Sequence, residues 1–197
     1  DEVKVERKAL PLPAFPELPP AQTELRADQS GEIYFPIKSP YDFSRVLNDY
    51  SELPQTTGKG TLVLPEGAGA NQPVPAIVIL HGSGGIAEGR EFEYAKLFSD
   101  NGMAAFVVDY YNPRGATKDY SYIIRTTAVT EFDAVSDAYH ALGYLRKHPN
   151  IDPERIDINV HPTKQEIKFD DEHLVYNYLR VAVRHALGQY SVTPTLD

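Results

Sequence analysis

Cysteine is absent from this chain of 197 residues, and its absence excludes three kinds of chemistry. Without thiols there can be no disulfide, no thiolate zinc site and no cysteine nucleophile. Apolar runs are also short: none approaches the roughly 20 residues that span a bilayer, so we expect no membrane partner. Basic residues are outnumbered, with 19 Lys and Arg against 28 Asp and Glu, and the formal net charge of -9 argues against nucleic acid as a main partner.

The residues that are present suit a folded domain. Hydrophobic residues make up 42% of the chain and charged residues 24%, which is ordinary for a globular protein. The length allows one domain, or one domain with a small appendage. Residues 1–31 differ from the rest, because they combine scattered charges with Pro11, Pro13, Pro16, Pro19 and Pro20 and show no apolar period. This composition predicts an extended arm or linker.

The central part of the chain carries the clearest structural signals. Strand-like runs at 32–37 and 60–64 precede two runs, 76–80 and 103–108, that are apolar at every position, and a helical segment at 91–101 separates the last two. Strands without alternation suit a parallel sheet that helices cover on both faces. From 127 to 147 we expect a single amphipathic helix with this buried stripe: Val129, Phe132, Val135, Ala138, Tyr139, Leu142 and Leu145. The order strand, helix, strand, helix predicts a doubly wound α/β layer.

The last forty or so residues follow another pattern. Ile156, Ile158 and Val160 alternate with polar residues, which is typical of a strand with one wet face. A short loop, a second alternating strand at 164–169 and an amphipathic helix follow. We therefore predict a β-β-α segment appended to the α/β layer.

Several blocks between residues 58 and 156 resemble, in order and spacing, the first half of the dienelactone hydrolase family of α/β-hydrolases: GKGTLVLPEG, PAIVILHGSGG, MAAFVVDYYNPRG and HPNIDPERI. The resemblance implies a partial doubly wound α/β-hydrolase-like sheet and hydrolysis of a small ester or lactone. It also implies that backbone N–H groups near Gly82, Ser83 and Gly84 stabilise an oxyanion. The alternative is a glycine-rich turn that binds nothing.

The nucleophile that this family requires is missing. After the DPERI-like segment the family has a strand that delivers G-x-S-x-G or a cysteine equivalent. Beyond Asp157 the only serine is Ser191 and the only glycine is Gly188. Ser83 lies in a different turn, and the side chain of its near neighbour His81 should point away from it. We therefore expect no complete catalytic set, and we expect His140 and His148 to be surface residues.

The segment IDPERIDINVHPTKQEIKFDDEHLVYNYLRVAVRHALGQ resembles a second family, the MutL mismatch-repair ATPases, near the end of their ATPase region. This resemblance implies that Lys164 matches the lysine that reaches the terminal phosphate of the nucleotide. However, no E-x-x-x-N box and no phosphate-binding glycine motif is present. We expect Lys164 to be an exposed loop lysine with at most a vestigial phosphate contact, and we expect no cofactor and no metal at His161 or His173.

The stretch Ile151–Ile156 fits both families, which suggests a chimera joined across a shared turn. We predict an arm at 1–31, a truncated hydrolase-like domain at 32–156 and a MutL-like tail at 157–197. The leading hypothesis is an inactive hydrolase half-domain without its nucleophile elbow. The alternatives are a mismatch-repair ATPase fragment that binds nucleotide or partner proteins, and a non-functional fusion. The first resemblance suits an exported protein and the second a cytoplasmic one, so the sequence leaves the compartment open, and it also leaves the oligomeric state open.

Overall fold

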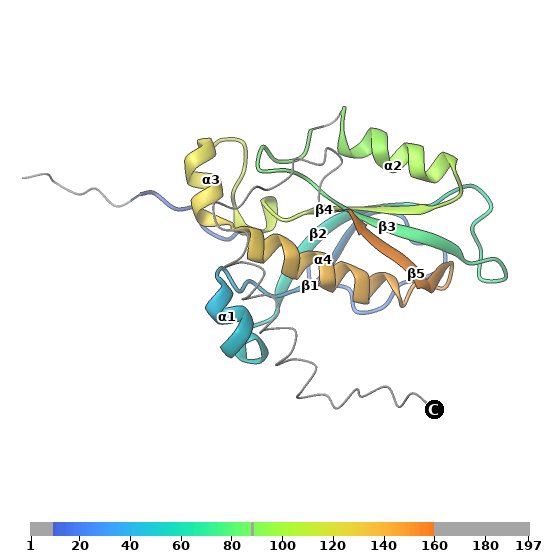
Figure 1. Ribbon diagram of the computed structural model, residues 1–197, viewed down its shortest axis with the longest axis horizontal. Coiled ribbons are helices and arrows are strands. Elements are labelled where there is room, and N and C mark those ends of the chain that lie inside the picture. The colour runs from blue at the N-terminus through green and yellow to red at the C-terminus, as the bar shows by residue number, and fades with distance from the viewer. Residues whose placement is uncertain (1–9, 88, 160–197) are drawn as a thin grey trace, which may run out of the picture. The chain divides into compact units, whose positions relative to one another are not determined.

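The computed structural model describes residues 10–87 and 89–159. The chain divides into two compact units, 1–162 and 163–197, and all the described residues lie in the first. Its centre is a five-stranded sheet with the order β1-β2-β4-β3-β5 (Figure 1). The strands are β1 (Gly31–Ile37), β2 (Thr56–Val63), β3 (Val74–Leu80), β4 (Ala104–Asp109) and β5 (Ile151–Asn159). β3 runs parallel to β4 and β5, whereas β2 runs antiparallel to β1 and β4. The predicted α/β class is confirmed, with a sheet of mixed direction.

Helices lie on both faces of the sheet, as the two apolar runs predict. Figure 1 shows α2 (Glu91–Asp100) on one side and α4 (Glu131–Leu145) on the other. Alternate side chains of β4 serve the two layers: Phe106 packs in the α4 layer and Val107 in the α2 layer, and both are fully or almost fully buried. The strands need apolar residues at every position because neither face meets water.

The single helix predicted at 127–147 is wrong. Two helices occupy this region, α3 (Tyr122–Ala128) and α4, and Val129 between them is extended. Thr130 and Asp133 form a capping box that begins α4. Because the cap needs non-helical backbone at Thr130, it ends the continuity that the apolar spacing suggests.

The predicted buried face of α4 is also wrong in part. Val135 and Tyr139 are 42% and 65% exposed, whereas Asp133 and Asp137 are buried. The face that meets the sheet carries small side chains, including Ala134, Ala138 and Ala141, and so lets the helix lie close to the strands. The two aspartates are tolerated there because Arg114, from the short helix η2 (Asn112–Arg114), lies beside them.

β5 lies beside β3 and at an edge of the described sheet. Ile156 and Ile158 pack against the α4-side core, while Asp157 is exposed. An alternating strand suits an edge position, because only one of its faces has to be apolar. The predicted junction between residues 156 and 157 falls inside this strand.

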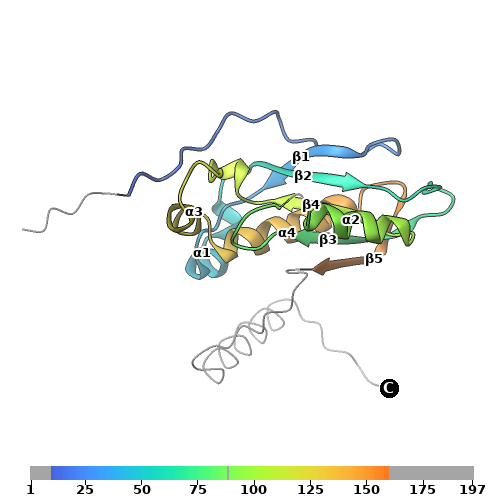
Figure 2. The same cartoon turned by 90° about the horizontal axis from the view of Figure 1, so that it is seen from above.

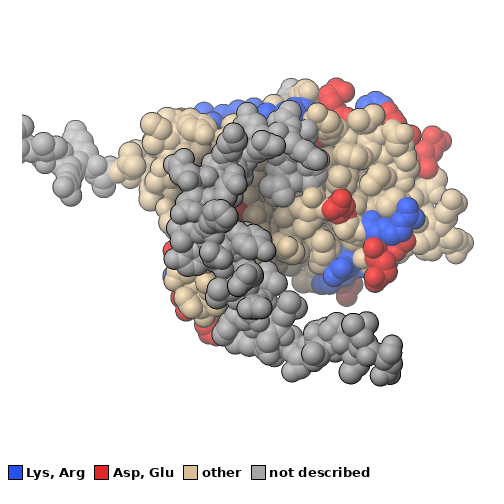
Figure 3. Space-filling model, in the orientation of Figure 1, with Lys and Arg blue, Asp and Glu red and all other residues tan. Residues whose placement is uncertain are grey.

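Residues 10–30 contain no helix or strand, and Figure 2 shows them, in blue, along the β1 side of the sheet. The N–H of Gln22 donates to the carbonyl of Tyr34 in β1. None of the helices described is both long and apolar enough to cross a membrane. On the face drawn in Figure 3, most of the coloured surface is neither acidic nor basic, and charged side chains of both signs are scattered over it.

Candidate functional site

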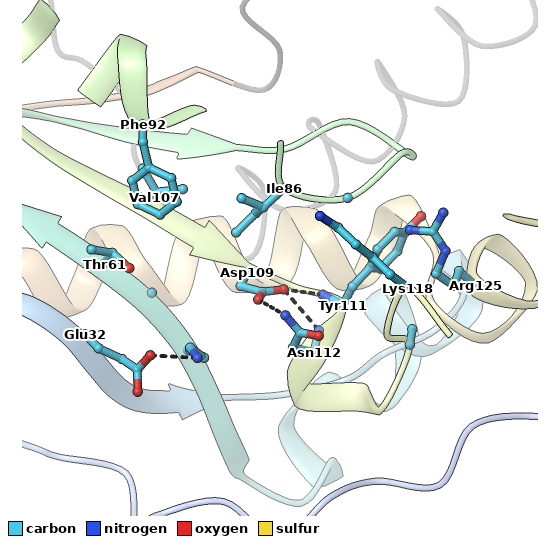
Figure 4. Close-up of a pocket in the computed structure, with 14 residues that line it drawn as sticks. Glu32, Thr61, Ile86, Phe92, Val107, Asp109, Tyr111, Asn112, Lys118 and Arg125 are labelled. Carbon is cyan, nitrogen blue, oxygen red and sulfur yellow. Dashed lines mark hydrogen bonds and ion pairs between the residues drawn. The ribbon is translucent and has the colours of Figure 1, made fainter. Parts of the chain in front are cut away.

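A cleft of about 290 Å³ lies at the carboxyl ends of β3 and β4. Two parallel strands end at the same edge of a sheet, so the loops that follow them come together there. The 81–85 loop follows β3 and contributes Gly85 to the lining, and β4 contributes Asp109 (Figure 4). Ligand sites of α/β sheets commonly lie at such an edge, and the sequence predicts the 81–85 loop as the functional element.

The 81–85 loop is a tight turn whose carbonyl groups are held by neighbouring side chains. The N–H of Gly85 donates to the carbonyl of Gly82 at 2.9 Å. The hydroxyl of Tyr111 donates to the carbonyl of Ser83, and the guanidinium of Arg125 donates to that of Gly84. Gly85 has a φ of +84°, and a Cβ there would lie 3.1 Å from Arg125 Nη1. A residue with a side chain would be strained at this position and would also crowd Arg125.

The predicted oxyanion groups lie at the exposed part of this turn. Ser83 and Gly84 are exposed and Gly82 is half-buried. In the part of the chain that the structure describes, no acceptor is within hydrogen-bond reach of the N–H groups of these three residues. Since the carbonyl groups of Ser83 and Gly84 already accept hydrogen bonds, the N–H groups are the part of the loop that can donate hydrogen bonds to a negatively polarised oxygen.

The described part of the chain offers Ser83 no base. Its Oγ accepts a hydrogen bond of 3.2 Å from the hydroxyl of Tyr122, which cannot activate it. The ring of His81 is buried, stacks on Tyr110 at 3.8 Å and donates through Nδ1 to the carbonyl of Gly82. A nucleophilic serine needs a base within hydrogen-bond reach, and none of the described residues supplies one here.

Asp109 provides a fixed negative charge in the cleft. Burial by itself raises the pKa of this carboxyl, but the His81 ring and the donors of Asn112 outweigh it and lower the pKa. His81 Nε2 is 3.8 Å from Asp109 Oδ1, which is too long for a hydrogen bond, so we assign the holding contacts to Asn112 and to the N–H of Tyr111. The carboxylate therefore stabilises the turn after β4 and is not available as a proton donor.

Charges of both signs line the cleft. Figure 4 shows Glu32 at one end, where it pairs with Lys59 at 2.7 Å, and Lys118 and Arg125 at the other end. Arg125 also lies over the ring of Tyr111, at 5.6 Å from its centroid. The cationic end is next to the 81–85 loop, so a polarised carbonyl or an anion would be favoured there.

The structure brings together three groups that the sequence did not connect, although they lie outside the cleft. The hydroxyl of Tyr50 lies 2.8 Å from Ser136 Oγ and 3.0 Å from His140 Nε2, and Ser136 donates to the carbonyl of Lys38. His140 is half-buried and His148 is 2% exposed, so the expectation that both are surface residues is wrong. The spacing of Ser136 and His140 by one helical turn indicates that the two side chains lie on the same face of a helix. Nothing in the sequence near Tyr50 indicated that its hydroxyl would meet them.

The remaining predicted site residues lie outside the described residues. These are Lys164, His161 and His173 of the tail. Within residues 10–87 and 89–159, no three His, Asp or Glu side chains gather in a way that could hold a metal ion.

Comparison with known proteins gives two kinds of similarity. The profile of the DNA mismatch repair protein C-terminal domain family matches residues 124–188. The MutL protein of Christiangramia forsetii is 60% identical over 70 residues, which are 32% of this chain and 11% of that protein. The chain thus spans about a tenth of the length of this relative. The profile match begins upstream of residues 151–156, where the motifs place the change of resemblance.

Solved structures that resemble the chain include proteins described as hydrolases. A Klebsiella pneumoniae protein described as a dienelactone hydrolase shares 16% identity with a TM-score of 0.44, over 64% of this chain and 48% of its own. An esterase of Thermogutta terrifontis shares 22% identity with a TM-score of 0.39, over 52% of this chain and 36% of its own. The C-terminal part of the chain, residues 124–188, matches the MutL mismatch-repair proteins, as the motif beyond residue 151 predicts.

Proposed function

We propose that residues 32–156 are a dienelactone hydrolase-like half-domain that has kept the oxyanion loop and lost the nucleophile, and that the chain does not turn over esters or lactones. One observation carries this proposal. β5 lies beside β3 and parallel to it, which is the place where an acyl-transfer enzyme of this type has the strand that leads to its nucleophile. The sequence that follows β5 reads Val160-His161-Pro162, without serine or cysteine.

The cleft supports binding without chemistry. Lys118 and Arg125 in the cleft can attract a negatively charged group, and beside it the N–H groups of Gly82, Ser83 and Gly84 can polarise a carbonyl. Polarisation alone leaves the carbonyl unattacked, because acyl transfer also needs an activated nucleophile within reach. A small ester or lactone would bind weakly and leave unchanged.

A fluorophosphonate probe tests this directly on the full chain. We expect no covalent labelling, and p-nitrophenyl acetate turnover no faster than in a solution of the unfolded chain. Ser83→Ala should change neither result, and Ser51→Ala, which replaces an exposed serine outside the cleft, is the matched control. Labelling that is lost in Ser83→Ala and kept in Ser51→Ala would show that Ser83 is a nucleophile after all.

A second candidate function follows from the 60% identity to MutL. In this proposal the tail binds a nucleotide or a partner protein, and Lys164 meets a phosphate oxygen as a flexible point charge. Titration of the full chain with a fluorescent ATP analogue, for the wild type, Lys164→Ala and the nearby control Lys168→Ala, separates the two candidates. Binding lost only in Lys164→Ala supports the tail, and equal weak binding by all three proteins contradicts it.

A further inference from the structure

The N-terminal arm carries a periodic pattern that the cleft does not use. Its residues 10–21 read LPLPAFPELPPA, with Glu17 as the only charged side chain. A large apolar residue followed by proline occurs three times at intervals of three residues: Leu12-Pro13, Phe15-Pro16 and Leu18-Pro19. Three residues are one turn of a polyproline II helix, so the apolar residues form one ridge of such a helix and the prolines form the ridge beside it.

The backbone of this segment is free of backbone hydrogen bonds. Residues 10–21 contain no helix or strand, and within the part of the chain that the structure describes none of their N–H or carbonyl groups bonds to another backbone group. The first such bond along the arm joins Gln22 to Tyr34 of β1. A polyproline II helix has the same property, because it makes no internal hydrogen bonds, and the five prolines of the segment fix φ near the value that this helix needs.

Most of both ridges is open to solvent. Leu12 is 58% exposed and Phe15 is 61% exposed, and Pro16 and Pro19 are exposed as well. Of residues 10–20, only Pro13 and Leu18 are half-buried. A linker that merely spans a distance needs no large apolar side chains in water, so their repeated exposure in one short segment indicates a contact surface.

The domain holds the segment at two places and leaves the ridges open between them. Pro13 and Ala14 lie against the turn after β4, where a Cβ on Gly115 would overlap the carbonyl of Ala14. At the other end, Gln22 is bonded to β1 and the side chain of Leu25 is buried. Figure 2 shows the extended course of the arm, in blue, along this side of the sheet. The segment is thus held extended before any partner binds, which lowers the entropy lost on binding.

The prolines also exclude two other modes of peptide recognition. A strand that joins the edge of a partner's sheet donates backbone N–H groups, and five of residues 11–20 are prolines that have none to give. A docking helix is excluded because proline breaks the interior of a helix. The mode that remains is recognition through side-chain ridges, in which aromatic rings of the partner pack on the prolines.

We propose that residues 11–20 are a docking motif for a partner protein whose binding groove is lined by aromatic side chains. Phe15 and Pro16, which are both exposed, fill the central pocket of that groove, and Leu12 and Pro19 contact it on either side. The groove has to follow the segment from Leu12 to Pro19, which is roughly 22 Å long at about 3.1 Å per residue. This motif is independent of the cleft and of the proposed loss of esterase activity.

Isothermal titration calorimetry on the full chain tests the proposal. The probes are three isolated domains that have aromatic-lined grooves of this type: an SH3 domain, a WW domain and an EVH1 domain. We expect at least one of them to bind the full chain saturably at a ratio of one to one. Its affinity should fall at least tenfold when an aromatic residue of its groove is replaced by alanine. Failure of all three domains to bind would overturn the proposal, and so would binding that the groove substitution leaves unchanged.

Variants of the chain locate the binding. The double variant Phe15→Ser with Pro16→Ala should bind the domain at least tenfold more weakly, because it empties the central pocket. Leu97→Ser is the matched control, because Leu97 is 54% exposed on α2, outside the arm, and should stay within twofold of the wild type. Equal affinity of the wild type and the double variant would overturn the proposal.

A synthetic peptide of residues 10–21 completes the test. We expect the full chain to bind the domain at least as tightly as the peptide does, because the fold already holds the segment extended. A peptide that binds while the full chain does not would show that the domain covers the motif, which would overturn the proposal. Light scattering that shows self-association of the chain, abolished by the double variant, would assign the arm to a second copy and also overturn it.

Discussion

Arg114 and Asp137 are joined by two parallel hydrogen bonds of 2.7 and 2.9 Å, and both side chains are at most 2% exposed. They connect the turn after β4 to the middle of α4. Arg114 also donates to Ser39 Oγ and to the carbonyl of Tyr110, so one side chain ties three segments together. Burial raises the pKa of Asp137, and although Arg114 opposes this the pKa still stands at about 6. Without its partner the buried carboxylate would be costlier still.

Removal of one member of this pair should destabilise the protein strongly. We expect Arg114→Ala to lower the free energy of unfolding by about 3 to 5 kcal/mol, because it leaves Asp137 buried without a counter-charge. Urea denaturation followed by circular dichroism measures the loss. The double variant Arg114→Met with Asp137→Leu should lose less than Arg114→Ala, because it leaves one buried carboxylate, that of Asp133, beside the lost guanidinium and not two. A larger loss in the double variant would show that the pair stabilises the fold by itself.

His148 should make stability depend on pH. Its Nδ1 accepts from the N–H of Asn150 at 3.1 Å and its Nε2 donates to the carbonyl of Gln29 at 3.2 Å, which requires the neutral ring. Burial lowers its pKa, although the hydrogen bond to Gln29 opposes this. The unfolded chain therefore takes up the proton at a higher pH than the folded chain does. The contribution is present above the ordinary pKa of about 6.5 and is lost as the pH falls below it.

The measurement compares the wild type with His148→Gln between pH 7.5 and pH 5. We expect the free energy of unfolding of the wild type to fall relative to that of the variant, by at most about 1.4 kcal/mol per pH unit. The difference between the two proteins isolates His148, because the other titrating groups are shared. Parallel pH profiles would contradict the assignment of the neutral ring.

Gly60 and Gly143 should respond to alanine in opposite directions. A Cβ at Gly60 would lie 2.8 Å from Cε2 of the fully buried Phe106, so Gly60→Ala should destabilise the domain by about 1 to 3 kcal/mol. Gly143 is exposed in α4 with no atom within 4 Å of such a Cβ, so Gly143→Ala should stabilise it by up to about 1 kcal/mol. Thermal melts of both variants test the pair, and a stabilised Gly60→Ala would show that Phe106 can move aside.

Gly115 leaves room for the N-terminal arm to pack close to the turn after β4. Its φ is +71°, and a Cβ there would overlap the carbonyl of Ala14 and approach Pro13. We expect Gly115→Val to displace the arm and to speed its cleavage by a protease at Phe15 several-fold. Gly67→Val is the control, because Gly67 also has a positive φ but has no atom within 4 Å of its Cβ position. Equal cleavage in both variants would show that backbone strain, and not contact with the arm, causes the change.

The strands and loops of the centre could be predicted because their signals are local. β3 and β4 are apolar throughout except for Asp109 at the end of β4, so their burial on both faces and the glycine-rich turn after β3 follow from the residues themselves. The resemblance of residues beyond 151 to MutL was equally readable, since the motif is contiguous, and the family match confirms it. The break between α3 and α4 was missed, although Thr130 and Asp133 have the spacing of a capping box.

The orientation of α4 could not be read in this way. Helical spacing shows that a stripe exists, but Ala134, Ala138 and Asp137 on one side compete with Val135 and Tyr139 on the other. The choice depends on Arg114, which is more than twenty residues away in the chain and makes burial of Asp137 tolerable. The place of β5 beside β3 and the meeting of Tyr50 with His140 are likewise long-range contacts. Local pattern was enough to place the central strands and the glycine-rich turn after β3. Only packing decided which face of α4 is buried and which is exposed, because burial of a charge depends on a partner that the local sequence does not contain.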